Sequence, residues 1–327
     1  MIKRYDFKRY ILLLLAFSLI FTALGTAAQA QSYPAKPINL LMPWPAGGLT
    51  DLVTRALCEP ASKTLGQPIL VINKPGGGTS IALVQLMQSP ADGYTLGYIT
   101  GSGIMMPHLQ NLPYDVNRDF SPLIRFIEFS TLGVVVKADA PWKTMKDLIE
   151  YARANPGKVK YTSPAVGNPN HIAMESLAKE VGVKWVHVPS KSGAEIITAL
   201  LGGHLDFAAT SPEWKPHVLA GKMRLLATLG QKRSGTFLDT PTLIDLGYKT
   251  YAPSFGGLIG PKGLPQPIAD KLHKVFKESM NDANFQKTCL QFDVDPSYNS
   301  PEGLAKDIRD LSALYGKFVQ EYGLKKE

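Results

Sequence analysis

The sequence has little cysteine and lacks the motifs of common catalytic and metal sites. Its 327 residues include two cysteines, Cys58 and Cys289, and no Cys/His spacing resembles a metal site. His-Glu-x-x-His and Gly-x-Ser-x-Gly do not occur, and the glycine run at 76–78 lacks the Gly-Lys-Ser/Thr of a phosphate-binding loop. We therefore predict no catalytic residues, no metal and no cofactor.

Clusters of basic residues and long apolar runs are missing from most of the chain. The formal charge is +8, yet beyond the first residues Lys and Arg gather only in short pairs such as Lys232-Arg233. This pattern fits a small anionic ligand and argues against nucleic acid as a partner. After residue 30 no segment is long and apolar enough to span a bilayer, so we expect a soluble mature protein.

The first 30 residues have the pattern of a secretory signal peptide. Basic residues come first, an apolar run follows at 11–24, and Ala28 and Ala30 form a small-x-small cleavage site. The apolar run is shorter than the ~20 residues that a membrane-spanning helix needs. No cysteine lies near the cleavage site, so a lipoprotein anchor is not expected. We predict export to the periplasm.

The two cysteines leave two alternatives open. An exported protein occupies a compartment that permits disulfides, so a Cys58–Cys289 bridge is possible. We expect both cysteines on helices of the same domain, which keeps that bridge feasible. The alternative is two buried free thiols.

Short strands alternate with helices along the mature chain, which indicates an α/β protein with parallel sheets. We expect strands at 38–42, 69–73, 94–100, 159–163, 184–188, 205–209, 223–229 and 254–259, with an extended crossing at 126–136. We expect helices at 49–65, 80–87, 145–154, 194–201, 269–280, 283–292 and 301–322, and a further helix that opens in the polar turn at 165–171 and runs to about 181. Pro60 lies inside the first of these helices and predicts a kink or an early end there.

Small and polar residues follow several of these strands. Ala46, Gly47 and Gly48 carry little or no side chain, so their amides can approach a ligand closely, and Trp44 can stack on it or pack. Gly101 and Ser102 follow another strand. Ligands bind at the carboxyl ends of strands in such sheets, and a helix N-terminus favours a carboxylate. We interpret the first loop as holding one end of a small organic anion; an ordinary strand-to-helix turn is the alternative.

The segment 43–51, Pro-Trp-Pro-Ala-Gly-Gly-Leu-Thr-Asp, resembles a signature of the extracytoplasmic solute receptors of tripartite tricarboxylate transporters, the Bug or TctC-like family. Further blocks resemble the family in order along nearly the whole mature chain. They lie at 92–96, 112–120, 155–158, 187–189, 200–206, 220–222, 232–234 and 241–243. Departures lie at 190–192, at 210–211, where the family often has Asp, and at Phe255, where Trp is common.

The resemblance implies a two-domain α/β fold of the periplasmic-binding-protein type, with the ligand between the domains. We expect domain 1 to comprise 31–131 and 229–327, and domain 2 to comprise 132–228, with hinges near 129–133 and 226–229. The resemblance implies that the second domain contacts the far end of the ligand. The residues are Gly167, Asn168, Asn170, His171, Thr210 and Ser211.

The function implied is capture of a small carboxylate, from di- and tricarboxylates to aromatic acids, and its delivery to the membrane permease subunits of a tripartite transporter. We expect a monomer. Structural roles are the alternative for several residues: a histidine in a first helical turn, as at His171, more often makes a structural hydrogen bond, and Asp51 would repel an anion. A sensory receptor that presents the closed complex to a signalling partner remains the main alternative function, and an enzyme on the same scaffold a remote one.

Overall fold

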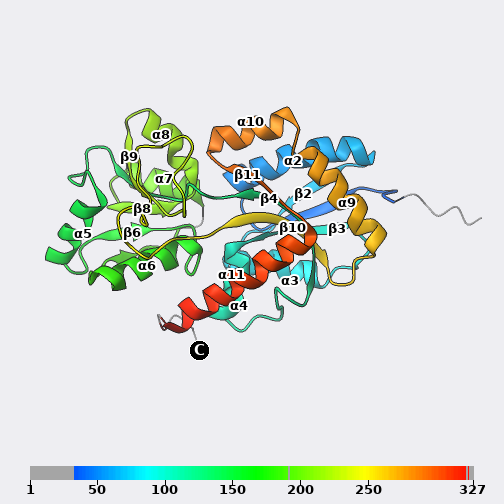
Figure 1. Ribbon diagram of the computed structural model, residues 1–327, viewed down its shortest axis with the longest axis horizontal. Helices are drawn as coiled ribbons and strands as arrows, with labels where there is room; N and C mark the ends of the chain where they lie inside the picture. Colours follow the sequence, from blue (N-terminus) through cyan, green and yellow to red (C-terminus); the bar gives the residue numbers. More distant parts are fainter. Residues whose placement is uncertain (1–32, 191, 322, 324–327) are drawn as a thin grey trace, which may run out of the picture. The chain divides into compact units, whose positions relative to one another are not determined.

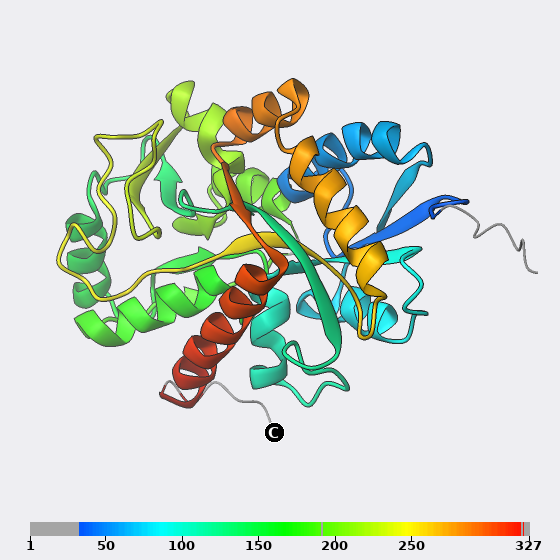
Figure 2. The same cartoon turned by 45° about the vertical axis from the view of Figure 1, so that its right-hand side comes forward.

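The apolar segment ahead of the small-residue loop forms β1 (Ile38–Met42), which pairs in parallel with a strand on each side. The computed structural model describes residues 33–190, 192–321 and 323, so the signal peptide expected at 1–30 lies outside the described residues. Lys36–Glu327 forms one compact unit, and the features below belong to it (Figures 1 and 2).

The first sheet has the strand order β11-β4-β10-β3-β1-β2. Its other strands are β2 (Ile69–Asn73), β3 (Thr95–Thr100), β4 (Phe120–Glu128), β10 (Phe255–Pro261) and β11 (Asp295–Asn299). Its helices are α2 (Leu49–Leu65), α3 (Ser80–Met87), α4 (Gly101–Leu109), α9 (Gln266–Ser279), α10 (Ala283–Phe292) and α11 (Pro301–Glu321), with the short helix η1 (Gly77–Thr79). Helices α2, α9 and α10 lie on one side of this sheet, and α3, α4 and α11 on the other (Figure 1).

The second sheet has the strand order β7-β6-β8-β5-β9. Its strands are β5 (Gly133–Lys137), β6 (Lys160–Thr162), β7 (Val186–His187), β8 (Phe207–Thr210) and β9 (Met223–Thr228). Its helices are α5 (Met145–Ala154), α6 (Pro169–Val181), α7 (Gly193–Leu201) and α8 (Lys215–Leu219), with the short helix η2 (Pro212–Trp214).

The prediction of parallel sheets is wrong in part, because both sheets are mixed. In the first sheet β10 runs antiparallel to β3 and β4, and β11 runs antiparallel to β4. In the second sheet β5 is antiparallel to β8 and β9. The antiparallel strands include those that carry the chain from one sheet to the other and back, and alternation of strands and helices does not report their direction.

The extended crossing expected at 126–136 is two strands in different sheets. β4 ends in the first sheet at Glu128, and β5 begins in the second sheet at Gly133. The chain returns after β9 through an irregular segment that leads to β10. The two sheets are therefore connected by two separate passages of the chain.

The longest early helix keeps its expected bounds despite an internal proline. α2 continues through Pro60 to Leu65, so an early end at Pro60 is ruled out. Gly66 then stops the helix at φ 69°, a left-handed conformation that glycine adopts without strain. Buried residues such as Val53, Leu57 and Ala61 follow one face of α2.

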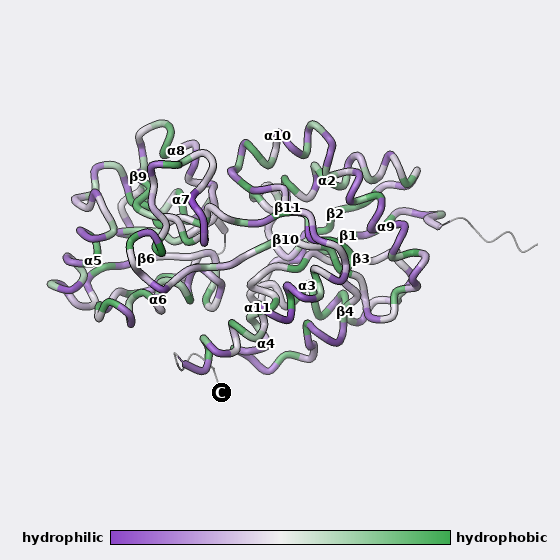
Figure 3. Tube along the Cα trace, in the orientation of Figure 1, coloured by the Kyte–Doolittle hydropathy of each residue, from purple (hydrophilic) through white to green (hydrophobic). Residues whose placement is uncertain are grey.

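Each sheet has its own apolar core. Strands β1, β3, β4, β5 and β10 are largely buried, and along α9 and α11 hydrophilic and hydrophobic residues alternate, as expected for helices with one face on a core (Figure 3). Across the described ranges we find no helix with the length and apolarity that crossing a membrane requires.

The two cysteines are free thiols, so the possible Cys58–Cys289 disulfide is not formed. As expected, they lie on two helices of the same sheet, α2 and α10, which contact each other. Both side chains are buried, and they pack in the core as small apolar groups.

Candidate functional site

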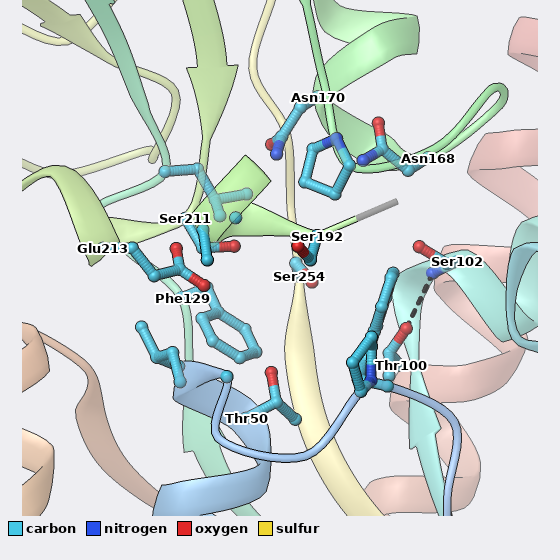
Figure 4. Close-up of a pocket in the computed structure, with 18 of the residues that line it drawn as sticks. Thr50, Thr100, Ser102, Phe129, Asn168, Asn170, Ser192, Ser211, Glu213 and Ser254 are labelled. Atoms are coloured by element: carbon cyan, nitrogen blue, oxygen red, sulfur yellow. Dashed lines mark hydrogen bonds between the residues drawn. The ribbon is translucent and has the colours of Figure 1, made fainter. Parts of the chain in front are cut away.

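A cavity of about 180 Å³ is lined by residues from both sheets and their connecting segments. From the first sheet's side come residues of the 44–50 loop, Tyr98, Thr100, Ser102 and Ser254, together with Phe129 and Leu132 of the crossing. From the second sheet's side come Pro164, Asn168, Pro169, Asn170, Ser192, Gly193, Ala194, Ser211 and Glu213. Figure 4 shows these side chains converging on a common space.

Four helices begin at this cavity. Leu49 and Thr50 open α2, Ser102 lies in the first turn of α4, Asn170 in that of α6, and Ala194 in that of α7. The first N–H groups of a helix have no partner within the helix, and the aligned peptide dipoles place partial positive charge there. Four such termini together make a site that favours an anion.

No lysine, arginine or histidine is among the described lining residues. Attraction for an anion at this site therefore has to come from backbone dipoles and polar side chains, which suits a small anion of low charge. The described residues also contain no cluster of His, Cys, Asp and Glu that could hold a metal ion.

The loop that precedes α2 is fixed by the buried carboxylate of Asp51. Asp51 Oδ2 accepts hydrogen bonds from Gly47 N–H and Arg55 Nε, both at 2.9 Å. Asn73 Nδ2 donates to Asp51 Oδ1 at 2.9 Å and to the Trp44 carbonyl at 2.8 Å. Gly47 adopts φ 79°, a conformation that favours glycine. The Gly47 amide therefore serves the loop itself, and the Asp51 carboxylate is held by donors of the loop, of α2 and of β2.

The N-terminus of α4 is capped by Thr100, whose Oγ1 accepts a hydrogen bond from Ser102 N–H at 3.0 Å (Figure 4). Glycine at position 101 permits a close approach, because a Cβ there would lie 2.7 Å from Tyr315 Oη and 2.9 Å from Pro169 Cγ. Gly101 thus lets α4 lie close to the start of α6, although it is not itself in the cavity lining.

The N-terminus of α6 is organised by Asn168 and His171. Asn168 Oδ1 accepts a hydrogen bond from His171 N–H at 2.7 Å, and His171 Nδ1 accepts one from Gly167 N–H at 2.9 Å. The His171 ring stacks on His187 with ring centres 4.1 Å apart. Burial lowers the pKa of His171 to about 4, so the ring is neutral at pH 7.

The structure brings most of the sequence-predicted site residues to one cavity. Those in the lining are Trp44, Ala46, Gly47, Gly48, Ser102, Asn168, Asn170 and Ser211. Gly101, Gly167, His171 and Thr210 are not in the lining; they lie behind it, where they hold the helix starts and the end of β8.

Sequence reasoning missed Ser192, Ser254 and Glu213. Ser192 caps α7, with its Oγ accepting a hydrogen bond from Glu195 N–H at 3.3 Å, and Ser-x-x-Glu is a helix-start pattern that could have placed it. Ser254 precedes β10, whose direction the sequence did not reveal. Glu213 lies two residues beyond the predicted pair Thr210-Ser211, within η2.

Among the described lining residues, Glu213 carries the acidic side chain. Burial raises the pKa of its carboxyl group to about 7, although hydrogen bonds from its own N–H and from Leu49 N–H act in the opposite direction. The side chain as a whole keeps partial exposure to the cavity, whereas its Oε2 is shielded from solvent.

Comparison with known proteins gives a consistent result. The family model described as "Tripartite tricarboxylate transporter family receptor" matches residues 53–324. The chain is 40% identical over 305 residues, 93% of each protein, to the UPF0065 protein in the gbd 5' region of Cupriavidus necator. The periplasmic binding protein BugD superposes with a TM-score of 0.82 at 28% identity, covering 90% of this chain and 100% of BugD. R. palustris Rpa4515 with adipate superposes with a TM-score of 0.81 at 27% identity, covering 89% and 98%.

Proposed function

Because the chain belongs to the tripartite tricarboxylate transporter receptor family, with its two-domain fold, we propose that it captures a small carboxylate and delivers it to membrane subunits of such a transporter. Capture takes place in the cavity between the two sheets, and the protein acts in the periplasm after removal of residues 1–30. The protein performs no chemistry on the ligand.

One observation carries this proposal: four helices have their N-termini at the cavity. The described lining residues include no cationic side chain, so these N-termini are the groups that attract an anion. Each terminus favours an anion by roughly 0.3–1 kcal/mol when exposed, and by more when partly buried. A carboxylate matches this site because its oxygens accept several N–H and O–H donors at once. The adipate that accompanies the structural relative Rpa4515 is a carboxylate of this kind.

The proposed binding residues are the eight predicted ones in the lining, joined by Thr50, Thr100 and Ser192. Gly48 and Ser102 contact the carboxylate from the first domain, and Asn170 and Ser211 contact the ligand from the second. Gly101, Gly167, His171 and Thr210 support these contacts from behind.

Closure of the two domains retains the ligand. We place the domain boundaries at 131/132 and 228/229, where the chain passes between the sheets, with hinges near 129–133 and 226–229. Because the ligand contacts residues of both domains only when they are closed, it stabilises the closed state by its difference in affinity for the two states.

A thermal-shift screen of the exported protein against carboxylates, amino acids, sugars and phosphates tests this function. A ligand at a hundredfold excess over its Kd stabilises the protein by about 2.7 kcal/mol, which raises Tm by several degrees. We expect shifts only with carboxylates. Shifts confined to sugars or phosphates, or turnover of a bound carboxylate, would contradict the proposal.

A further inference from the structure

The carboxylate of Glu213 lies between the N-termini of two helices that belong to different sheets. On α2, the Leu49 N–H hydrogen-bonds to it. On α7, a Cβ placed on Gly193 would lie 2.5 Å from Glu213 Cδ, so the carboxyl group packs directly against the first residue of that helix. Glu213 therefore already supplies an acidic group to two of the four helix starts around the cavity.

The other two helix starts lie away from this carboxylate. Figure 4 shows Glu213 on one side of the cavity, and Thr100 and Ser102 of the α4 start on the opposite side. The described lining residues at the starts of α4 and α6 include no acidic side chain. One ligand carboxylate can therefore bind at this end without meeting a like charge.

Three buried side-chain atoms of the described lining lack a hydrogen-bond partner; one is Tyr98 Oη, a hydroxyl oxygen that can donate as well as accept. Glu213 Oε2 and Asn170 Oδ1 are shielded from solvent and have no hydrogen-bond partner among the described residues. The Asn170 amide can rotate to present its NH₂ group instead, so it adapts to either kind of ligand. At pH 8, above its pKa of about 7, the Glu213 carboxyl group is mostly ionised and only accepts hydrogen bonds, so its unpartnered oxygen calls for a donor.

Resting on the proposed function, we propose that the ligand carries a single carboxylate and that its other end presents a hydrogen-bond donor, a hydroxyl or an ammonium group, to Glu213. Glu213 is then a specificity-determining residue that disfavours a second ionised carboxylate. Such a group would meet a like charge in a cavity whose described lining has no cation to offset it.

The test uses ligands of equal length that differ at one end. Succinate, 4-hydroxybutyrate and 4-aminobutyrate form one set, and adipate, 6-hydroxyhexanoate and 6-aminohexanoate form a longer one. Calorimetry on the exported protein at pH 8 should show that the hydroxy or amino acid binds about tenfold or more tightly than the dicarboxylate of its set. The comparison of hydroxy with amino acid identifies the donor.

Variants of Glu213 then assign the effect. In Glu213→Gln the dicarboxylate should gain affinity by about tenfold and the amino acid should lose affinity, whereas Glu213→Asp should keep the native preference. Glu150→Gln removes the same charge from an exposed residue of α5 outside the lining, and it should change nothing. Lys191 lies outside the described residues, so Lys191→Ala is measured in parallel.

Three results would overturn the inference. They are tighter binding of the dicarboxylate by the native protein, an unchanged preference in Glu213→Gln, and a preference lost in Lys191→Ala but not in Glu213→Gln. In each of these cases capture of a carboxylate would still stand. If no carboxylate bound to the native protein or to Glu213→Gln, the proposed function would fail as well.

Discussion

Asp51 Oδ2 accepts a hydrogen bond from the backbone N–H of Gly47 at 2.9 Å, across the turn that joins β1 to α2. The same carboxylate receives Arg55 and Asn73, and Asn73 also holds the Trp44 carbonyl. The loop that faces the cavity is thus held in one shape by a buried acidic residue below it. Its remaining amides are oriented before any ligand arrives, which lowers the entropic cost of binding.

Replacing Asp51 should therefore affect both stability and binding. Asp51→Ala leaves Gly47 N–H and Asn73 without their acceptor, and we expect it to lower the free energy of unfolding by about 2–3 kcal/mol. Ligand affinity should fall as well, because the loop is no longer fixed. Chemical denaturation and calorimetry measure the two effects, and Asp139→Ala, which removes an exposed surface ion pair, serves as the control. Native stability in Asp51→Ala would show that the network does not hold the loop.

The hydroxyl of Ser102 should contribute to ligand affinity. Ser102 opens α4 at the cavity, and Ser102→Ala removes a donor while keeping the backbone. We expect Kd to rise by about ten- to a hundredfold, the usual value of one hydrogen bond to a charged group. Ser89→Ala, on an exposed hydrogen bond at the end of α3, is the matched control. Equal affinities of the two variants would remove Ser102 from the site.

Glu213 should impose a pH dependence on stability. Its pKa is raised from 4.5 to about 7 by burial, so the folded protein binds more protons than the unfolded chain between these values. Its stability contribution is therefore fully present below pH 4.5 and is lost as the pH rises through 7, by at most about 3 kcal/mol.

Two buried histidines give the free energy of unfolding the opposite dependence on pH. Burial lowers the pKa of His171 to about 4, and burial together with His171 lowers that of His187 to about 3. Their contribution to stability is present above pH 6.5 and is lost as the pH falls. In the native protein this loss partly cancels the pH dependence that Glu213 imposes on stability. The difference in unfolding free energy between the native protein and Glu213→Gln isolates the contribution of Glu213, because the histidines are the same in both. The variant should gain stability relative to the native protein from pH 4.5 to 8. A difference that is constant with pH would contradict the buried position of Glu213.

Cys58 and Cys289 should be unreactive in the folded protein. Burial raises the pKa of each thiol to about 12, so almost no thiolate is present at pH 8. Alkylation followed by mass spectrometry should label neither cysteine in the native protein and both after unfolding. Two cysteines that stayed unlabelled after unfolding, with a mass two hydrogens lower, would reveal a disulfide.

The sequence predicted the parts of this site that depend on local chemistry. Gly47 and Gly48 were singled out because small residues in a strand-to-helix turn let backbone amides approach a ligand, although an ordinary turn was the alternative, and because the segment 43–51 resembles the family signature. The bounds of α2, α3, α5 and α10 followed from apolar spacing and from turn residues such as Gly66. These features depend on residues that lie close together in the chain.

The features that were missed depend on contacts between distant segments. Glu213 becomes a site residue only because η2 brings it to Leu49, more than a hundred residues away in the chain, and nothing near Pro212 signals that contact. Likewise, the antiparallel direction of β10 is set by the return of the chain from the second sheet. His171 was singled out by the family resemblance, yet its ring accepts a hydrogen bond from Gly167 N–H and stacks on His187.

The most direct test of carboxylate capture at the helix starts is a calorimetric titration of Gly48→Leu with the carboxylate that gives the largest thermal shift. Gly48 has an ordinary φ of −74°, and a Cβ there would meet only Pro45 O at 3.6 Å, so a larger side chain fits without strain and occupies the cavity lining. Gly235→Leu, at an exposed glycine with open space around it, is the control. We predict that Gly48→Leu binds about a hundredfold more weakly, while Gly235→Leu binds normally and both variants keep a native Tm. Binding by Gly48→Leu with the native Kd would show that the ligand is held elsewhere.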